Sequence, residues 1–127
     1  QTLRDSELAH AIPAKELRTI ERRGTAVRFD AGRQAMREDT IGRECMMVIS
    51  GSFAVERGGE CIAVLQPGMV MGEVALLTGR PRNATVTALE ESLVYAYSRG
   101  EFTSLLHECP QLAAIIRDDV EARSPAA

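Results

Sequence analysis

The chain has 127 residues, of which 45% are hydrophobic and 26% are charged, with a formal net charge of −3. This length fits one domain with its own core, and no apolar run reaches the roughly 20 residues of a membrane-spanning helix. The negative charge and the scarcity of aromatic residues exclude a broad basic, base-stacking surface for nucleic acid. Because the three cysteines are widely spaced and no signal peptide opens the chain, we expect a reducing, cytoplasmic setting. The chain begins at Gln1 without Met, so we expect a piece of a longer protein.

The first part of the chain, residues 1–23, has the pattern of helices. Apolar residues recur there at helical spacing, and Pro13 suits the first position of a helix. Gly24 then ends the pattern, because glycine commonly follows the last turn of a helix. We expect these helices to cap a domain built mainly of strands.

From residue 25 the pattern changes to short strands separated by turns. The expected strands are 25–29, 34–37, 45–49, 52–55, 62–65, 85–88 and 93–97. The run 45–49 is apolar throughout, as in a strand buried on both faces. Gly58-Gly59 predicts a hairpin, and Pro67-Gly68 predicts a type II turn. So many short strands predict a sandwich or a barrel.

Two helices are expected after the last strand. Ser98 and Glu101 have the spacing of a capping box and predict a helix start there. Pro110 follows Cys109 and restarts a second helix, whose apolar stripe continues toward residue 123.

The stretch 71–86 concentrates the residues with binding chemistry. Gly72 has no Cβ, so its backbone can come close to a neighbour. Glu73 stands at the start of an expected turn of helix over 74–77, and such a helix start favours anions. Arg82 follows a proline, and a guanidinium can grip a phosphate through two parallel hydrogen bonds. One stretch therefore presents an acceptor for hydroxyl groups and a receptor for a phosphate.

Two segments of this stretch resemble the phosphate-binding cassette of the cyclic nucleotide-binding domain family, which includes the bacterial cAMP receptor protein and kinase regulatory subunits. They are Gly72-Glu73-Val74-Ala75-Leu76 and Arg80-Pro81-Arg82-Asn83-Ala84-Thr85-Val86. The resemblance covers about residues 8–123. It implies a mainly β fold, a jelly-roll-like double-sheet β-roll with an N-terminal helix and two C-terminal helices. The implied single domain, 1–127, divides into N-terminal helices (1–23), the roll (24–98) with its cassette (71–86), and the B and C helices (99–123).

The resemblance also assigns roles to residues. It implies that Glu73 binds the ribose 2′-hydroxyl and that Arg82 binds the cyclic phosphate, whereas Arg80 is read as surface. Arg123 matches a basic residue of the last helix near the phosphate. The full implied ligand-binding set is Val55, Ile62, Met71, Gly72, Glu73, Val74, Ala75, Arg82, Asn83, Ala84 and Arg123.

Two positions depart from the family pattern. Asn83 stands where the family commonly has Ser, Thr or Ala, and its amide could donate to a phosphate oxygen or reach the purine edge. Asp39 stands where a turn glycine is usual, so we expect altered loop geometry there. Both departures favour an alternative in which the roll is a structural or interaction module that binds no nucleotide.

The expected function is regulatory binding of a 3′,5′-cyclic nucleotide, cAMP in preference to cGMP, coupled to an attached effector domain. The sequence has no arrangement typical of a nucleophile with its base and no metal-ligand spacing, so we expect no enzyme, no metal and no cofactor. In the family the last helix closes over the base and often forms the interface of a dimer. The resemblance therefore allows a homodimer formed through this helix. A further alternative is the sensor half of a transcription regulator.

Overall fold

The computed structural model describes residue 3 and residues 6–123, with side chains through residue 118. Within these residues the elements follow one another as α1 (Glu7–Ala11), α2 (Ala14–Arg23), β1 (Thr25–Phe29), β2 (Gln34–Met36), β3 (Glu44–Ser50), β4 (Phe53–Arg57), β5 (Glu60–Leu65), β6 (Val70–Met71), α3 (Glu73–Thr78), β7 (Thr85–Ala88), β8 (Ser92–Ser98), α4 (Arg99–Glu108) and α5 (Pro110–Arg123).

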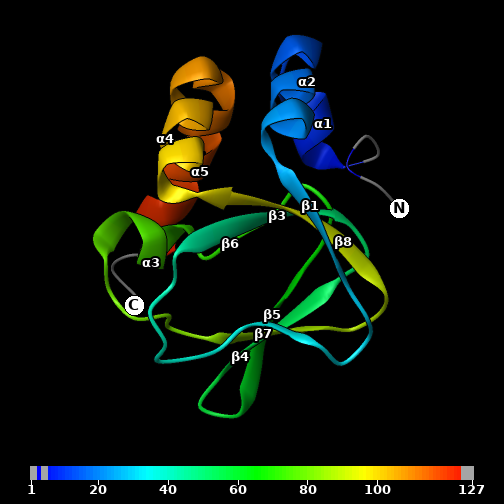
Figure 1. Cartoon of the computed structure of the whole chain (residues 1–127), viewed down its shortest axis with the longest axis vertical. Coiled ribbons are helices and arrows are strands. Elements are labelled where there is room, and N and C mark those ends of the chain that lie inside the picture. Colours follow the sequence, from blue (N-terminus) through cyan, green and yellow to red (C-terminus); the bar gives the residue numbers. More distant parts are fainter. Residues whose placement is uncertain (1–2, 4–5, 124–127) are drawn as a thin grey trace.

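The strands form two antiparallel four-stranded sheets. The first has the order β1-β8-β3-β6 and the second the order β2-β7-β4-β5. The helices α1, α2, α4 and α5 cover the outer face of the first sheet, and the second sheet lies on its other side (Figure 1). The predicted double-sheet β-roll with flanking helices is therefore confirmed.

Strand β3 lies at the centre of this arrangement, and its side chains alternate between two hydrophobic clusters. Cys45, Met47 and Ile49 face the cluster under the helices. Met46 and Val48 face the cluster between the two sheets. All five are at most 9% exposed, which confirms the prediction that this run is buried on both faces.

The hairpin between β4 and β5 turns at two glycines, Gly58 (φ +60°) and Gly59 (φ +82°), as the sequence predicts. The pairing of the two strands then shifts, because Val55 opposes Ala63 whereas the next residue of β4 opposes Cys61. Ile62 is thus the extra residue of a β-bulge. Bulges bend a strand locally, and this one lies where the hairpin meets the pocket described below.

The N-terminal helical region differs from the prediction in one detail. Pro13 is the N-cap of α2 and not its first helical residue. Ile12, directly before it, is extended (φ −123°, ψ 155°) and ends α1. The reason is that a residue preceding proline is driven out of the helical conformation.

The loop at Asp39 also differs from the prediction. Asp39 has φ +67°, the left-handed conformation that a turn glycine would adopt. Aspartate tolerates this conformation better than most residues. The expected altered geometry is therefore not found at this residue, since the substitution keeps the glycine-type backbone.

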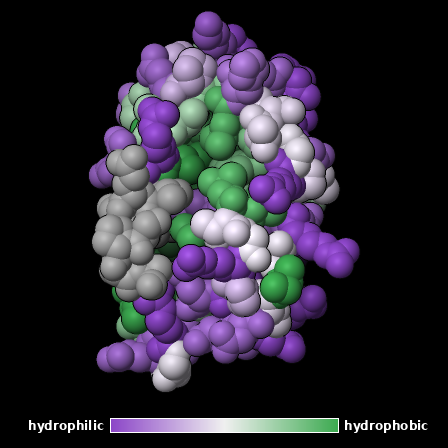
Figure 2. Space-filling model, turned by 90° about the vertical axis from the view of Figure 1, so that its left-hand side faces the viewer, coloured by the Kyte–Doolittle hydropathy of each residue, from purple (hydrophilic) through white to green (hydrophobic). Residues whose placement is uncertain are grey.

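Figure 2 shows the side of the molecule on which α3 lies, with apolar surface gathered near its middle among hydrophilic residues. The exposed large apolar side chains include Ile62 and Val64 of β5 and Leu77 of α3. Across the described part of the chain, no helix combines the length and the apolar character that crossing a bilayer requires.

Candidate functional site

A pocket of about 340 Å³ lies between the β4–β5 hairpin, the start of α3 and the loop before β7. It contains every predicted ligand-binding residue whose side chain the structure describes. These residues are Val55, Ile62, Met71, Gly72, Glu73, Val74, Ala75, Arg82, Asn83 and Ala84. The remaining predicted residue, Arg123, lies outside the described side chains.

Gly72 joins β6 to α3, and only glycine fits its position. It is the N-cap of α3 with φ +83°, a conformation that favours glycine. A Cβ at this residue would overlap the Arg82 guanidinium and would lie 2.6 Å from Cε of Met36. The missing side chain therefore lets the first turn of α3 pack directly on the arginine.

Helix α3 connects the pocket with the helical side of the molecule. Glu73, Val74 and Ala75 line the pocket, whereas Leu76 packs in the cluster under the helices. The Leu76 amide donates to the carbonyl of Gly72 at 3.1 Å. The Leu76 amide is therefore not available to a ligand.

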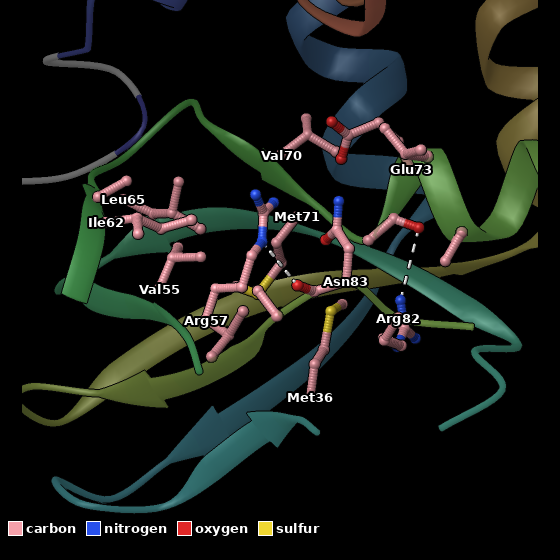
Figure 3. Close-up of a pocket in the computed structure, with 16 residues that line it drawn as sticks. Met36, Val55, Arg57, Ile62, Leu65, Val70, Met71, Glu73, Arg82 and Asn83 are labelled. Atoms are coloured by element: carbon pink, nitrogen blue, oxygen red, sulfur yellow. Dashed lines mark hydrogen bonds between the residues drawn. The ribbon is translucent and has the colours of Figure 1, made fainter. Parts of the chain in front are cut away.

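Glu73 lines the pocket from the start of α3, and its side chain is buried. It is 1% exposed, and its charge acts on Arg82. Glu73 and Arg82 therefore both line the pocket, and in Figure 3 the Glu73 carboxyl group points away from the Arg82 guanidinium.

The Arg82 side chain is held by backbone carbonyls. Its Nη2 donates to the carbonyl of Glu44 at 2.7 Å, and Nη1 makes a longer bond of 3.5 Å to that of Gly72 (Figure 3). Arg82 is 8% exposed, and burial lowers its pKa, while the Glu44 and Glu73 carboxylates oppose this shift. An arginine stays protonated in proteins, so the pocket contains a fixed cation with further N–H groups.

The loop 39–42 holds Arg82 from the other side. The Arg82 amide donates to the carbonyl of Thr40, and the Asp39 amide donates to the carbonyl of Arg82, both at 2.8 Å. A Cβ on Gly42 would overlap the guanidinium. Gly42 is therefore required for the arginine's position, a role that the sequence pattern did not reveal. Arg80 is exposed and does not line the pocket.

The sequence reasoning missed several lining residues. Met36 and Val86 are register partners on β2 and β7, and both line the pocket. Alternation along β2 could have indicated Met36. Arg57 was missed because an arginine at a strand end is usually surface, yet its Nε donates to the carbonyl of Asn83 at 3.0 Å.

Comparison with known proteins agrees with this geometry. The family model "Cyclic nucleotide-binding domain" matches residues 26–109. A cyclic nucleotide-gated potassium channel of Mesorhizobium japonicum is 30% identical over 127 residues, which are the whole chain and 33% of the channel. A cAMP-dependent protein kinase regulatory subunit of Eremothecium gossypii is 35% identical over 79 residues, 61% of this chain and 17% of that subunit. The chain thus spans a third or less of these relatives.

The fold has a counterpart among solved structures. The catabolite activator protein of Thermus thermophilus superimposes with a TM-score of 0.82 at 24% identity, covering 95% of this chain and 59% of that one. This likeness supports the β-roll assignment, and the family model matches well over half of the chain, including the whole stretch that builds the pocket. The chain therefore belongs to the cyclic nucleotide-binding domain family.

Proposed function

We propose that the pocket reversibly binds a purine 3′,5′-cyclic nucleotide, with cAMP as the expected ligand, and that the domain regulates without catalysing a reaction. The observation that carries this proposal is that a buried acidic residue, Glu73, and a buried arginine, Arg82, line the same pocket. Its volume of about 340 Å³ lies in the range of small-molecule sites.

Each part of the pocket suits one part of such a ligand. Arg82 offers N–H donors to the cyclic phosphate. Glu73 accepts a hydrogen bond from the ribose 2′-hydroxyl. Val55 and Ile62 supply apolar surface for the ribose and the base, and Asn83 offers its amide at the edge of the pocket. The preference for cAMP is supported by the kinase relative, whose name specifies that nucleotide.

Helix α3 offers a route from the pocket to the rest of a larger protein. A ligand that draws Glu73 and Val74 toward it also moves Leu76, which packs against the helical cluster. Occupancy can then bias the packing of α4 and α5 and so affect an attached effector domain. On this proposal the whole chain, 1–127, is one cytoplasmic sensor domain, and its last helix with Arg123 closes over the base and can form a homodimer seam.

The direct test is a calorimetric titration with cAMP and with cGMP, together with thermal unfolding. A ligand at about 100 times its Kd stabilises the folded state by roughly 2.7 kcal/mol. A thermal transition that neither nucleotide moves at millimolar concentration would favour the alternative of a structural or interaction module.

The roles of the two charged residues are tested by substitution. Arg82→Ala should cost about 2–5 kcal/mol of binding free energy, roughly 30-fold to several thousand-fold in Kd. Arg80→Ala is the matched control and should be close to neutral. Arg82→Ala should also lower the free energy of unfolding, because the Glu44 carbonyl loses its donor. Glu73→Gln should weaken binding of the ribonucleotide and hardly affect its 2′-deoxy analogue.

A further inference from the structure

A second arginine, Arg57, faces the pocket from the end of β4. Its Nε donates to the carbonyl of Asn83 at 3.0 Å, so the side chain is anchored on the same loop that carries Arg82. Figure 3 shows the Arg57 guanidinium beside the Asn83 side chain, with Asn83 between the two arginines in this view. No motif in the sequence indicates that Arg57 belongs to the site.

The Arg57 guanidinium has more open hydrogen-bonding capacity than that of Arg82. Arg57 is exposed, and among the described residues it forms no ion pair and its one hydrogen bond uses Nε. Both of its Nη groups therefore keep their N–H donors. Arg82, by contrast, is buried and already donates to two backbone carbonyls.

The net charge of the pocket also points to Arg57. The charged side chains of the pocket are Arg57, Glu73 and Arg82. Because the negative Glu73 offsets one arginine, the pocket has a net positive charge only when Arg57 is counted. The phosphodiester of a cyclic nucleotide carries one negative charge, and a pocket without Arg57 would be formally neutral.

We propose that Arg57 is a second anion-binding group of this pocket and that it contacts the cyclic phosphate together with Arg82. The inference rests on the proposed function, since it assigns a further residue to the same ligand. Arg82, held by its carbonyl contacts, binds one exocyclic oxygen, and Arg57 reaches the other through its Nη groups. The Asn83 carbonyl sets the position of Arg57, so the loop before β7 holds both cations.

The test is calorimetric titration of the full 127-residue chain with cAMP and with an uncharged alkyl ester of its cyclic phosphate. The variants are Arg57→Gln, which removes the charge, Arg57→Lys, which keeps it, and Arg80→Gln as the matched exposed control. Arg57→Gln should weaken cAMP binding about tenfold, the loss of one charge-assisted hydrogen bond, with Arg57→Lys intermediate. Against the neutral ester, wild type and Arg57→Gln should bind alike. Raising the salt concentration should reduce the difference in cAMP affinity between the wild type and Arg57→Gln, because salt screens an exposed cation.

The outcomes separate this inference from the proposal beneath it. If the wild type binds neither cAMP nor cGMP, the proposed function fails and the role of Arg57 fails with it. If the wild type binds cAMP and Arg57→Gln behaves like Arg80→Gln, the role of Arg57 alone is overturned. Equal losses for cAMP and its ester would also overturn it, since Arg57 would then act by shaping the loop. A loss confined to cGMP would do the same and would indicate contact with the guanine edge, where arginine pairs with O6 and N7.

Discussion

The two faces of the β1-β8-β3-β6 sheet are packed in different ways. Each face has a hydrophobic cluster with one aromatic pair. Between the sheets Phe29 meets Phe53 edge to face, with ring centroids 5.9 Å apart and planes at 80°. Under the helices Tyr97 meets Phe102 at 6.4 Å and 49°. The first cluster is enclosed by hydrogen-bonded strands on both sides, whereas the second is enclosed by helices on one side.

In addition to the apolar cluster, polar contacts between residues far apart in the sequence hold the helices in place. Glu16 of α2 accepts hydrogen bonds from the amides of Gln111 (3.2 Å) and Leu112 (3.0 Å) and so caps the start of α5. The Tyr97 hydroxyl donates to the carbonyl of Ile20 in α2 at 2.6 Å. Glu16 and Tyr97 are both buried. The strands are thus joined by continuous backbone hydrogen bonding, whereas the helices are joined to the sheet by side-chain packing and by these separate polar contacts.

The largest effect is expected from truncating one phenylalanine in each cluster. Phe53→Ala and Phe102→Ala remove side chains that are at most 1% exposed, and each should cost about 3–5 kcal/mol of unfolding free energy. Denaturant unfolding measures that cost. Amide hydrogen exchange should show loss of protection in the strands for Phe53→Ala, but mainly in α4 and α5 for Phe102→Ala. Equal loss of strand protection in both variants would mean that the two clusters form one cooperative unit.

A smaller effect is expected from the cap on α5. Glu16→Ala leaves two backbone amides without their acceptor and should cost about 1–3 kcal/mol. Glu16→Gln keeps one acceptor oxygen and should cost less. The loss should appear as faster hydrogen exchange in the first turn of α5, with Glu60→Ala, an exposed carboxylate of the roll, as the control. Unchanged exchange in that turn would show that apolar packing alone holds α5.

The hydrogen bond from Tyr97 to Ile20 should contribute less to stability than the cap on α5. Burial raises the pKa of the Tyr97 phenol well above its ordinary value, so the hydroxyl stays protonated and donating. Tyr97→Phe keeps the ring and removes only this donor, which should cost about 1 kcal/mol. Thermal unfolding monitored by circular dichroism measures the change. A variant as stable as the wild type would indicate that the Ile20 carbonyl finds another donor.

The smallest effect is expected from the ion pair between Arg23 and Glu108, two exposed side chains that join α2 to α4. The hydrogen bond from Arg23 lowers the pKa of Glu108 below its ordinary 4.5. The pair therefore stabilises the fold at pH values above the ordinary pKa of a glutamate. This contribution is lost as the pH falls through the lowered pKa of Glu108. Arg23→Gln should shift the melting temperature only slightly at neutral pH and not at all in strong acid. A shift that persisted in acid would assign the effect to packing.

The roll and its cassette were predictable because their signals are local. Glycines at the turns, alternation along the strands and the spacing from Gly72 to Arg82 are all visible within short windows of sequence. The structure brings the predicted residues together in one pocket because β6, α3 and the loop before β7 follow one another directly along the chain.

The contacts that the sequence did not reveal join distant positions. Nothing near Glu16 indicates that its carboxylate caps a helix beginning at Pro110. The reason for glycine at position 42 is the guanidinium of Arg82, 40 positions later in the sequence. Arg57 is positioned at the pocket by a hydrogen bond to the backbone carbonyl of Asn83. Every residue type has such a carbonyl, so the identity of the acceptor residue could not indicate this contact. Such pairings depend on the register of the folded sheets and not on any local pattern.

The distribution of thiols has a practical consequence. Cys45 and Cys109 are fully buried, and burial raises the pKa of Cys109 to about 11 and that of Cys45 further. Cys61 is exposed on β5, next to Ile62 of the pocket. A thiol reacts as the thiolate and only where reagents reach it, so a maleimide dye should label the native protein at Cys61 alone. The unsubstituted chain thus carries its own attachment point for a fluorescent reporter of pocket occupancy.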